Sequence, residues 1–109
     1  KKEGFIPAVE VKNVDNGRTV RVAGVVAHRQ RPGTANGIIF MTLEDETGLL
    51  NIVVKPALFE KQRTTILRHN LLKVTARVQR DGESISLLAS HFIPLMAQPP
   101  DNIKSRDFR

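Results

Sequence analysis

Hydrophobic and polar residues alternate along most of this chain, and five stretches of alternation predict β-strands. The first stretch, residues 19–29, is rich in β-branched residues, which are typical of strands. In the second, residues 37–44, the side chains of Ile39, Met41 and Leu43 share one face. The chain is therefore expected to be mostly β. Three further strands are predicted at residues 49–54, 71–79 and 84–92.

Turn-forming residues separate these predicted strands. Residues 31–37 are dense in Pro, Gly and Asn and predict a loop. Residues 45–48 and 80–83 predict hairpin turns, the second of which contains an Asp-Gly pair. Gly24 lies inside the first predicted strand, where a glycine indicates a bulge or a sharp bend.

One stretch has helical rather than alternating spacing. Pro56 suits the first turn of a helix, because its missing N–H would have no partner there. Leu58, Phe59 and Ile66 then follow at helical intervals. A single short helix is therefore predicted over residues 56–66.

The order of three strands, a helix and two strands predicts the fold class. It is all-β with one short helix: a five-stranded Greek-key OB-fold barrel with the helix between strands 3 and 4. A glycine bend in the first strand favours a closed barrel over a flat sheet. The position of the helix argues against the alternatives, a small sandwich and an SH3-like barrel. We divide the chain into a lead-in or linker (1–17), the OB-fold domain (18–93) and a C-terminal tail (94–109).

Composition excludes several classes of protein. The 109 residues suffice for one domain, and a hydrophobic content of 40% is too high for a disordered tail. The absence of cysteine excludes disulfides and thiolate metal sites and fits a cytoplasmic protein. No apolar run approaches the roughly 20 residues that span a bilayer, so no membrane partner is expected. The first residue is not Met, which indicates a fragment of a longer protein.

No catalytic site, cofactor or metal is expected in this segment. Glu44, Asp45 and Glu46 are adjacent carboxylates at a turn, where neighbouring side chains diverge. No second acidic cluster is available to complete a two-metal site. The three histidines lack close metal-ligand spacing, and the glycines of the 31–37 loop match neither a P-loop nor a dinucleotide-binding fingerprint.

The charge of the chain indicates a polyanionic partner, with nucleic acid as the first candidate. The formal net charge is +6. The basic side chains are clustered, because no acidic residue occurs between positions 16 and 43 or between positions 61 and 80. OB-folds usually bind ligands on strands 2 and 3 and on the loops that join strands 1–2 and 4–5.

Five basic residues fall at the edges of that expected surface. Arg29 and Arg31 flank the first loop. Arg77 and Arg80 flank the second, and Lys55 follows the third strand. We predict that these cations contact phosphates. The alternative is that they only solvate the barrel.

Phe40 is the aromatic residue that carries most information. If Ile39 and Met41 face the core, Phe40 faces solvent beside Thr42, and Asn51 lies across the hairpin. An exposed phenylalanine among polar groups suits stacking on an unpaired base, and an asparagine amide suits hydrogen bonding to a base edge. The alternative is that Phe40 packs under a loop or against a partner protein.

Several motifs resemble a known family. The residues at 20–26 and 37–48, the second ending in Leu-Glu-Asp-Glu-Thr-Gly, resemble the OB-fold of the anticodon-binding superfamily. The stretch Arg-Gln-Arg-Pro-Gly-Thr-Ala at 29–35 and the ending Lys-Ser-Arg-Asp-Phe at 104–108 are similar to one branch of bacterial C-family DNA polymerases. This is the error-prone, translesion branch, paralogous to the polymerase III alpha subunit. The resemblance spans about residues 18–109 and implies the C-terminal side of such an enzyme.

The resemblance has further implications. It implies a parent enzyme that copies past DNA lesions during a damage response, together with accessory proteins, and whose metal-binding carboxylates lie in another domain. In related domains, a phenylalanine placed like Phe40 stacks on a base, and a polar residue placed like Asn51 reads base edges. Asn51 is shorter than the glutamine common in the synthetases, so the resemblance implies binding without strong sequence preference.

Three hypotheses follow. The first is a non-catalytic domain that binds single-stranded template DNA in a translesion polymerase. The second is a docking module for accessory proteins of the mutagenesis complex, with Phe40 and Phe108 as anchors. The third is an anticodon-binding domain of a tRNA synthetase, which a preference for RNA would support.

Overall fold

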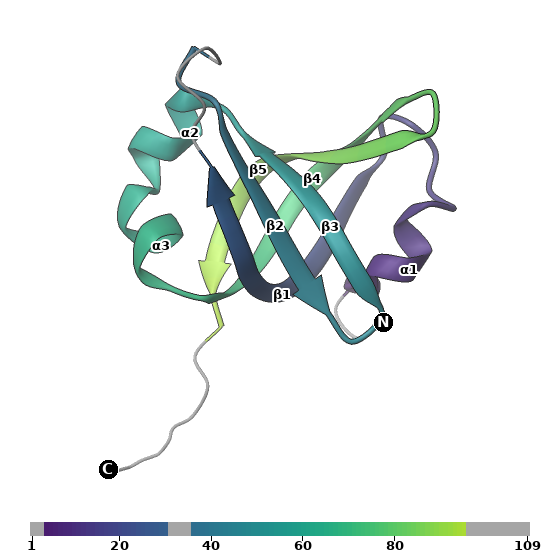
Figure 1. Ribbon diagram of the computed structural model, residues 1–109, viewed down its shortest axis with the longest axis horizontal. Helices are drawn as coiled ribbons and strands as arrows, with labels where there is room; N and C mark the ends of the chain where they lie inside the picture. The colour runs from purple at the N-terminus through teal and green to yellow at the C-terminus, as the bar shows by residue number, and fades with distance from the viewer. Residues whose placement is uncertain (1–3, 31–35, 96–109) are drawn as a thin grey trace, which may run out of the picture.

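The computed structural model describes residues 4–30 and 36–95 and folds them into a closed barrel (Figure 1). Around the barrel the strand order is β1-β2-β3-β5-β4; β3 and β5 are parallel, and the other neighbours are antiparallel. The predicted fold class, a five-stranded OB-fold barrel, is confirmed. The strands are β1 (Thr19–Gln30), β2 (Ile39–Asp45), β3 (Gly48–Val54), β4 (Leu71–Asp81) and β5 (Ser84–Pro94). The helices are α1 (Ala8–Val11), α2 (Pro56–Lys61) and α3 (Arg63–Arg68).

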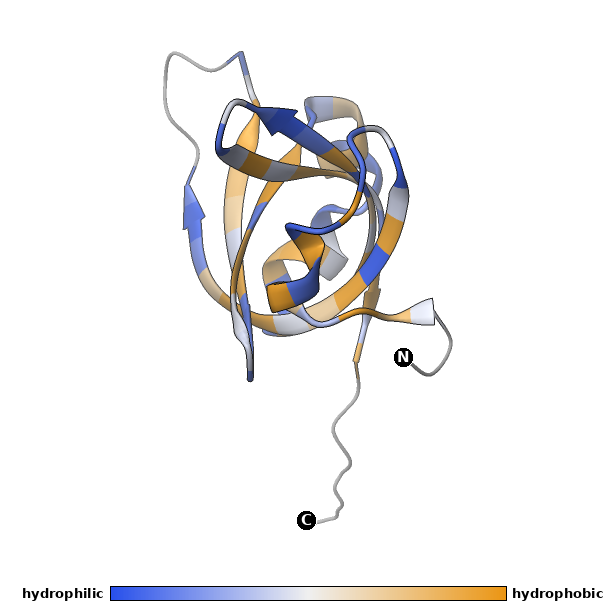
Figure 2. Cartoon of the chain, turned by 90° about the vertical axis from the view of Figure 1, so that its right-hand side faces the viewer, coloured by the Kyte–Doolittle hydropathy of each residue, from blue (hydrophilic) through white to orange (hydrophobic). Residues whose placement is uncertain are grey.

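The core consists of the inward-facing positions of all the strands. Ile39, Met41 and Leu43 are buried as the alternation predicted, and Phe92 of β5 is the largest fully buried side chain. Hydropathy alternates along the strands, and α1 lies across one end of the barrel (Figure 2). The helices α2 and α3 lie at the other end (Figure 1). No helix in the described part of the chain is long and apolar enough to cross a membrane.

Strand β1 closes the barrel by pairing with two different strands. Its first half, from Thr19 to Val25, pairs with β4, and its second half, from Val25 onward, pairs with β2. A bulge follows between Val26 and His28. At the changeover, a Cβ built on Gly24 would lie 2.6 Å from the backbone oxygen of Glu44. Gly24 is therefore needed because the backbones of β1 and β2 come too close for any side chain.

The helical segment differs from the single helix that was predicted. It consists of two short helices that break at Gln62, whose φ is −120°. The Gln62 side chain donates from Nε2 to the Phe92 carbonyl (2.8 Å), and the Phe92 N–H donates to Gln62 Oε1 (2.7 Å). The Gln62 side-chain amide therefore pairs with the β5 backbone as the backbone of a neighbouring strand would. Phe59 of α2 and Ile66 of α3 are both buried, so both helices pack on the barrel.

Residues 4–17, which the sequence pattern assigned to a lead-in or linker, pack on the barrel. The Ile6 N–H donates to the Arg21 carbonyl (2.9 Å), so this segment lies alongside β1. Ala8 and Val11 of α1 are buried in the core. A single helical turn carries too few apolar positions to produce a visible period, so the sequence pattern missed it. The Leu95 N–H donates to the Leu71 carbonyl (2.9 Å), and the tail from residue 96, with Phe108, lies outside the described residues.

Asp45 holds α1 against the β2–β3 turn. Its Oδ2 accepts a hydrogen bond from the Ala8 N–H (2.8 Å), and its Oδ1 accepts from the Thr47 N–H (2.7 Å) and hydroxyl (2.7 Å) and from the Gly48 N–H (3.1 Å). Burial raises the pKa of Asp45, but the hydrogen bonds from Thr47, Ala8 and Gly48 lower it and leave it below its ordinary value. Asp45 is thus a structural acceptor rather than a freely solvated turn residue.

The close approach at Gly24 makes a prediction about stability. We expect Gly24→Ala to lower the free energy of unfolding by about 2 kcal/mol, because the added methyl must push β1 and β2 apart. Urea unfolding measures this directly. The control is Ala27→Ser at an exposed position of the same strand, which should stay within about 0.5 kcal/mol of the parent. Equal midpoints for Gly24→Ala and the parent would contradict the closure argument.

The hydrogen bonds of Asp45 predict a dependence of stability on acid. The folded-state pKa lies below the ordinary value of 3.8, so the stabilisation is present above that value and is lost as the pH falls through the folded pKa. We expect Asp45→Asn to be less stable at neutral pH by about 1 kcal/mol or more, and to lose less stability on acidification. Unfolding curves between pH 7 and pH 2 measure both effects. Glu46→Gln, at the exposed neighbouring position, should retain the acid dependence of the parent.

Candidate nucleic-acid interface

The outward face of β2 and β3 brings together three of the predicted site residues. Phe40 pairs with Val53 and Thr42 pairs with Asn51 in the antiparallel register. Directly opposed side chains in such a pair lie about 4.5–5.5 Å apart at Cβ. The Phe40 side chain is 39% exposed, as alternation predicted, while Thr42 is half-buried and Asn51 is exposed.

An apolar stripe extends from Phe40 across the neighbouring strands. Val53 of β3 pairs with both Phe40 of β2 and Leu88 of β5. Val53 and Leu88 are half-buried, and both share the outward side of the barrel with Phe40. We call these three residues the apolar stripe. It is a surface on which a planar ring could lie flat.

Lys55 lies at one end of this face, beside the base of the β1–β2 loop. It is exposed and directly precedes α2. A Cβ built on Gly37 would lie 3.2 Å from Cγ of Pro56, so the end of the loop touches the start of α2. Asn36 and Gly37 both have positive φ (54° and 83°), which turns the chain back into β2. Arg31, on the same loop, lies outside the described residues.

Arg29 is engaged with the end of a helix. Its Nε donates to the Ile66 carbonyl (3.0 Å), and its Nη2 donates to the His69 carbonyl (2.9 Å). The last carbonyls of a helix have no partner within the helix, so this guanidinium satisfies groups that would otherwise need water. Arg29 is half-buried and stabilises the C-terminus of α3. Its contact with a phosphate stays a prediction.

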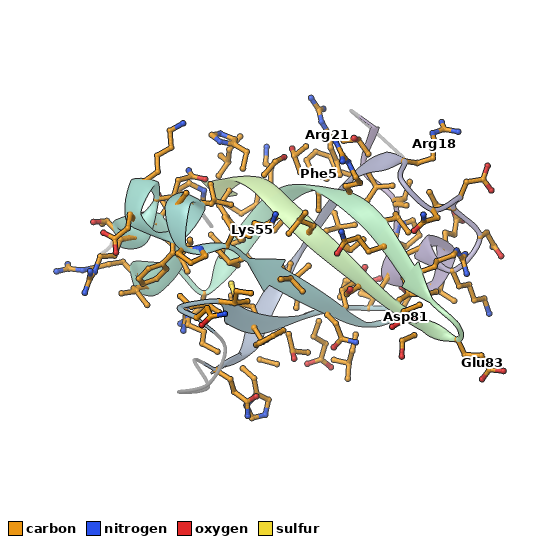
Figure 3. The ribbon with its side chains drawn as sticks, turned by 90° about the horizontal axis from the view of Figure 1, so that it is seen from above. Phe5, Arg18, Arg21, Lys55, Asp81 and Glu83 are labelled. Carbon is orange, nitrogen blue, oxygen red and sulfur yellow. The ribbon has the colours of Figure 1, made fainter. Side chains whose placement is uncertain are left out.

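Arg80 is engaged with the N-terminal segment. Its Nε and Nη2 donate to the Val14 carbonyl (3.2 and 3.0 Å), and Nη2 also donates to the Lys12 carbonyl. The tip of the β4–β5 hairpin beyond it carries Asp81 and Glu83, both exposed (Figure 3). Arg80, which directly precedes the acidic tip, therefore fastens the segment after α1 to the barrel. Phosphate contact by Arg80 stays a prediction.

Arg77 lies on a different side of the barrel from Phe40. It is exposed on β4, where it pairs with Leu88 of β5 and Thr19 of β1. Two strands, β3 and β5, separate it from β2 along this row. At about 4.8 Å per strand, the three steps from Phe40 to Arg77 span about 14 Å around the surface. The structure thus groups Phe40, Thr42, Asn51 and Lys55, but not Arg77.

Lys12 is a candidate that the sequence pattern did not reveal. It lines a hollow of about 150 Å³ between α1 and β3, together with Asn51 and Leu49. Its position was hidden because the segment containing it was expected to be a linker. Among the residues that the structure describes, no three His, Asp or Glu side chains gather as a metal site.

Comparison with known proteins places this geometry in a family. Residues 20–95 match the family described as "OB-fold nucleic acid binding domain". The chain is 47% identical over 93 residues to "Error-prone DNA polymerase 2" of Agrobacterium fabrum, and 47% identical over 93 residues to "Error-prone DNA polymerase" of Dechloromonas aromatica. Each alignment covers 85% of this chain but only 9% of the relative. The resemblance to error-prone polymerases is confirmed, while the position within a parent enzyme stays a prediction.

A solved structure supports the same fold. Asparaginyl-tRNA synthetase from Pyrococcus horikoshii, in complex with asparaginyl-adenylate, superposes with a TM-score of 0.66 at 26% identity. The superposition covers 85% of this chain and 22% of the synthetase. The barrel is therefore shared by proteins of different activity, and the fold alone does not distinguish DNA from RNA as the ligand.

The carbonyl contacts of Arg29 predict a structural effect of mutation. We expect Arg29→Lys to lower the free energy of unfolding by about 1–2 kcal/mol, because a lysine retains the charge but loses the two-pronged contact. Arg77→Lys, at an exposed position on β4, is the matched control and should be nearly neutral. Thermal unfolding of both variants measures the difference. Equal losses would mean that the Arg29 contacts contribute nothing specific.

Proposed function

This chain belongs to the family of OB-fold nucleic acid binding domains, and we propose that it binds single-stranded template DNA. In this proposal it is a non-catalytic domain of an error-prone translesion polymerase. The relatives at 47% identity are named error-prone DNA polymerases, which supports the proposed parent and its cytoplasmic setting. The observation that carries the proposal is the 39% exposed Phe40 at the head of the apolar stripe. Polymerase chemistry belongs to the rest of such a parent.

Base stacking is the main proposed interaction. One unpaired base stacks on the Phe40 ring, and the half-buried side chains of Val53 and Leu88 extend the apolar contact. Every base has a π-face, so such stacking tolerates any sequence. This tolerance suits a template strand whose sequence varies.

Polar groups beside the ring add hydrogen bonds. The Thr42 hydroxyl both donates and accepts, and the Asn51 amide does the same. Both lie on the adjacent cross-strand pair, so both are within reach of a base or sugar on Phe40. Because these two side chains are small and can both donate and accept hydrogen bonds, they favour adaptable contacts over recognition of one particular base.

Cations beside the stripe are proposed to hold phosphates. Lys55 lies beside the end of the β1–β2 loop, and Arg31, which belongs to the same loop in the sequence, is proposed as a second phosphate contact. Lysine and arginine side chains release counterions from the nucleic acid on binding, which makes the affinity dependent on salt. The net charge of +6 acts in the same direction at longer range.

A protein partner is the second candidate, because the apolar stripe would also suit an accessory subunit. Aromatic side chains such as Phe40 often anchor protein interfaces. The acidic tip formed by Asp81 and Glu83 repels phosphates, which favours a protein partner over DNA at that end. The two candidates differ in salt dependence, since an apolar contact with a protein releases few counterions.

Binding of labelled single-stranded DNA tests the proposal. We expect affinity to fall steeply with salt, and Phe40→Ala to weaken binding by about 1–3 kcal/mol, the value of one stacked base. Fluorescence anisotropy at two salt concentrations measures both effects. The matched control is Leu67→Ala, which removes an apolar side chain that is 48% exposed on α3 and should not change the affinity.

Three outcomes would contradict the proposal in different ways. No binding at low salt would favour the protein-docking alternative. Tighter binding to RNA of the same sequence would favour an anticodon-binding role. An unchanged affinity in Phe40→Ala, with DNA binding intact, would place the bases elsewhere on the barrel.

A further inference from the structure

A second basic surface lies on the outward side of β1 and β4, away from the apolar stripe. Lys73 pairs with Ala23, and Arg77 pairs with Thr19. Arg21 lies between them on β1, opposite a threonine of β4. The cations therefore alternate between the two strands and never oppose one another. The β1–β4 face, as we call it, consists of Arg18, Arg21, Lys73 and Arg77.

Closure of the barrel separates the two surfaces. Strands β2 and β4 flank β1 on opposite sides, so their outward side chains point in different directions. Arg18, Arg21 and Phe5 lie along one edge of the barrel in Figure 3, whereas Asp81 and Glu83 lie at the tip of the β4–β5 hairpin. The face is thus separate from the site on β2 and β3.

The strands that carry this face contain almost no acidic residues. Residues 19–30, 71–80 and 84–94, which form nearly all of β1, β4 and β5, contain no Asp or Glu. Among the described residues, the other carboxylates lie at the β2–β3 turn, at the β4–β5 tip, on α2 and in the N-terminal segment before Arg18. Basic side chains on strands that lack acidic residues raise the local positive potential, which attracts polyanions.

Phe5 holds two of these cations in place. Its ring centroid lies 5.8 Å from Cζ of Arg21 and 5.5 Å from Nζ of Lys73. The ring is itself fixed, because Phe5 forms a β-bridge with Arg21 and the next N–H donates to the Arg21 carbonyl. Long basic side chains lose conformational freedom when they bind an anion. A ring that already restrains them lowers that cost.

The register connects this face to the apolar stripe. Leu88, the last residue of the stripe, pairs directly with Arg77, the first cation of the face. A strand whose bases stack on the stripe and whose path follows this row therefore reaches Arg77 next. Beyond it lie Lys73 and Arg21, on the two strands that form the face.

We propose that the β1–β4 face binds the phosphodiester backbone of the same single strand, so that the DNA passes around the barrel after its bases leave the stripe. This inference rests on the proposed function and adds a second contact surface to it. It also predicts a length requirement. The stripe spans two strand spacings, or about 10 Å, so an oligonucleotide of about 2 nucleotides covers it alone, whereas one of about 12 reaches both surfaces.

The test removes charge from the face and varies the length of the DNA. In the 109-residue chain, Lys73→Gln with Arg77→Gln removes two outward cations and leaves the three residues of the stripe unchanged. We expect affinity for a 12-nucleotide oligothymidylate to fall about tenfold, and affinity for a 2-nucleotide one to change less than about twofold. The slope of log affinity against log salt should fall by about 1.4 for the longer DNA, because two phosphate contacts are lost.

A matched control separates the face from general charge. Lys61→Gln with Arg68→Gln removes the same charge from exposed positions on α2 and α3. It should change the affinity for either length by less than about threefold. A second variant, Phe5→Leu, keeps an apolar side chain but removes the ring, and should weaken binding of the longer DNA only. Thermal unfolding confirms that each variant is folded.

The outcomes distinguish failure of this inference from failure of the proposed function. Equal affinities of the parent chain for the short and long DNA would overturn the inference and leave the stripe intact. Equal losses in the face variant and the helix control would also overturn it, since general charge would then explain the binding. Absence of binding to either length would instead overturn the proposed function on which the inference rests.

Discussion

The close approach of two backbones at Gly24 is the constraint on which the rest of this structure depends. It allows β1 to leave β4 and join β2, and a side chain at this position would collide with the Glu44 carbonyl. Because the sheet closes into a barrel, the outward side chains of different strands point in different directions. The aromatic platform of β2 and the cations of β4 consequently occupy different sides of one small barrel.

Basic side chains have two kinds of surroundings in this domain. Arg29 and Arg80 donate to backbone carbonyls and so fasten α3 and the N-terminal segment to the barrel. Their charges remain, but their hydrogen-bond donors are largely committed. Arg77 and Lys73, by contrast, stand outward on β4. Basic charge alone therefore does not identify a phosphate-binding residue, and the hydrogen-bonding partners of each guanidinium decide how much of it is available.

This chain is short compared with the proteins that it resembles. The chain spans 9% of the length of the error-prone polymerases that it matches. A small barrel that binds by stacking and charge adds affinity for a strand without adding base selectivity. Under the proposed function, such a module would keep a template strand close to an active site elsewhere in a longer protein.

The sequence by itself determined the strands, the hairpin turns and the outward position of Phe40, because alternation has a period of two residues and can be read locally. It also indicated the bend at Gly24. The docking of α1, the break at Gln62 and the carbonyl contacts of Arg29 were decided only by the tertiary structure. Arg29 contacts a carbonyl 37 residues away, and Gln62 pairs with a backbone 30 residues away. No local pattern records such a partner, since which groups meet depends on how the whole barrel closes.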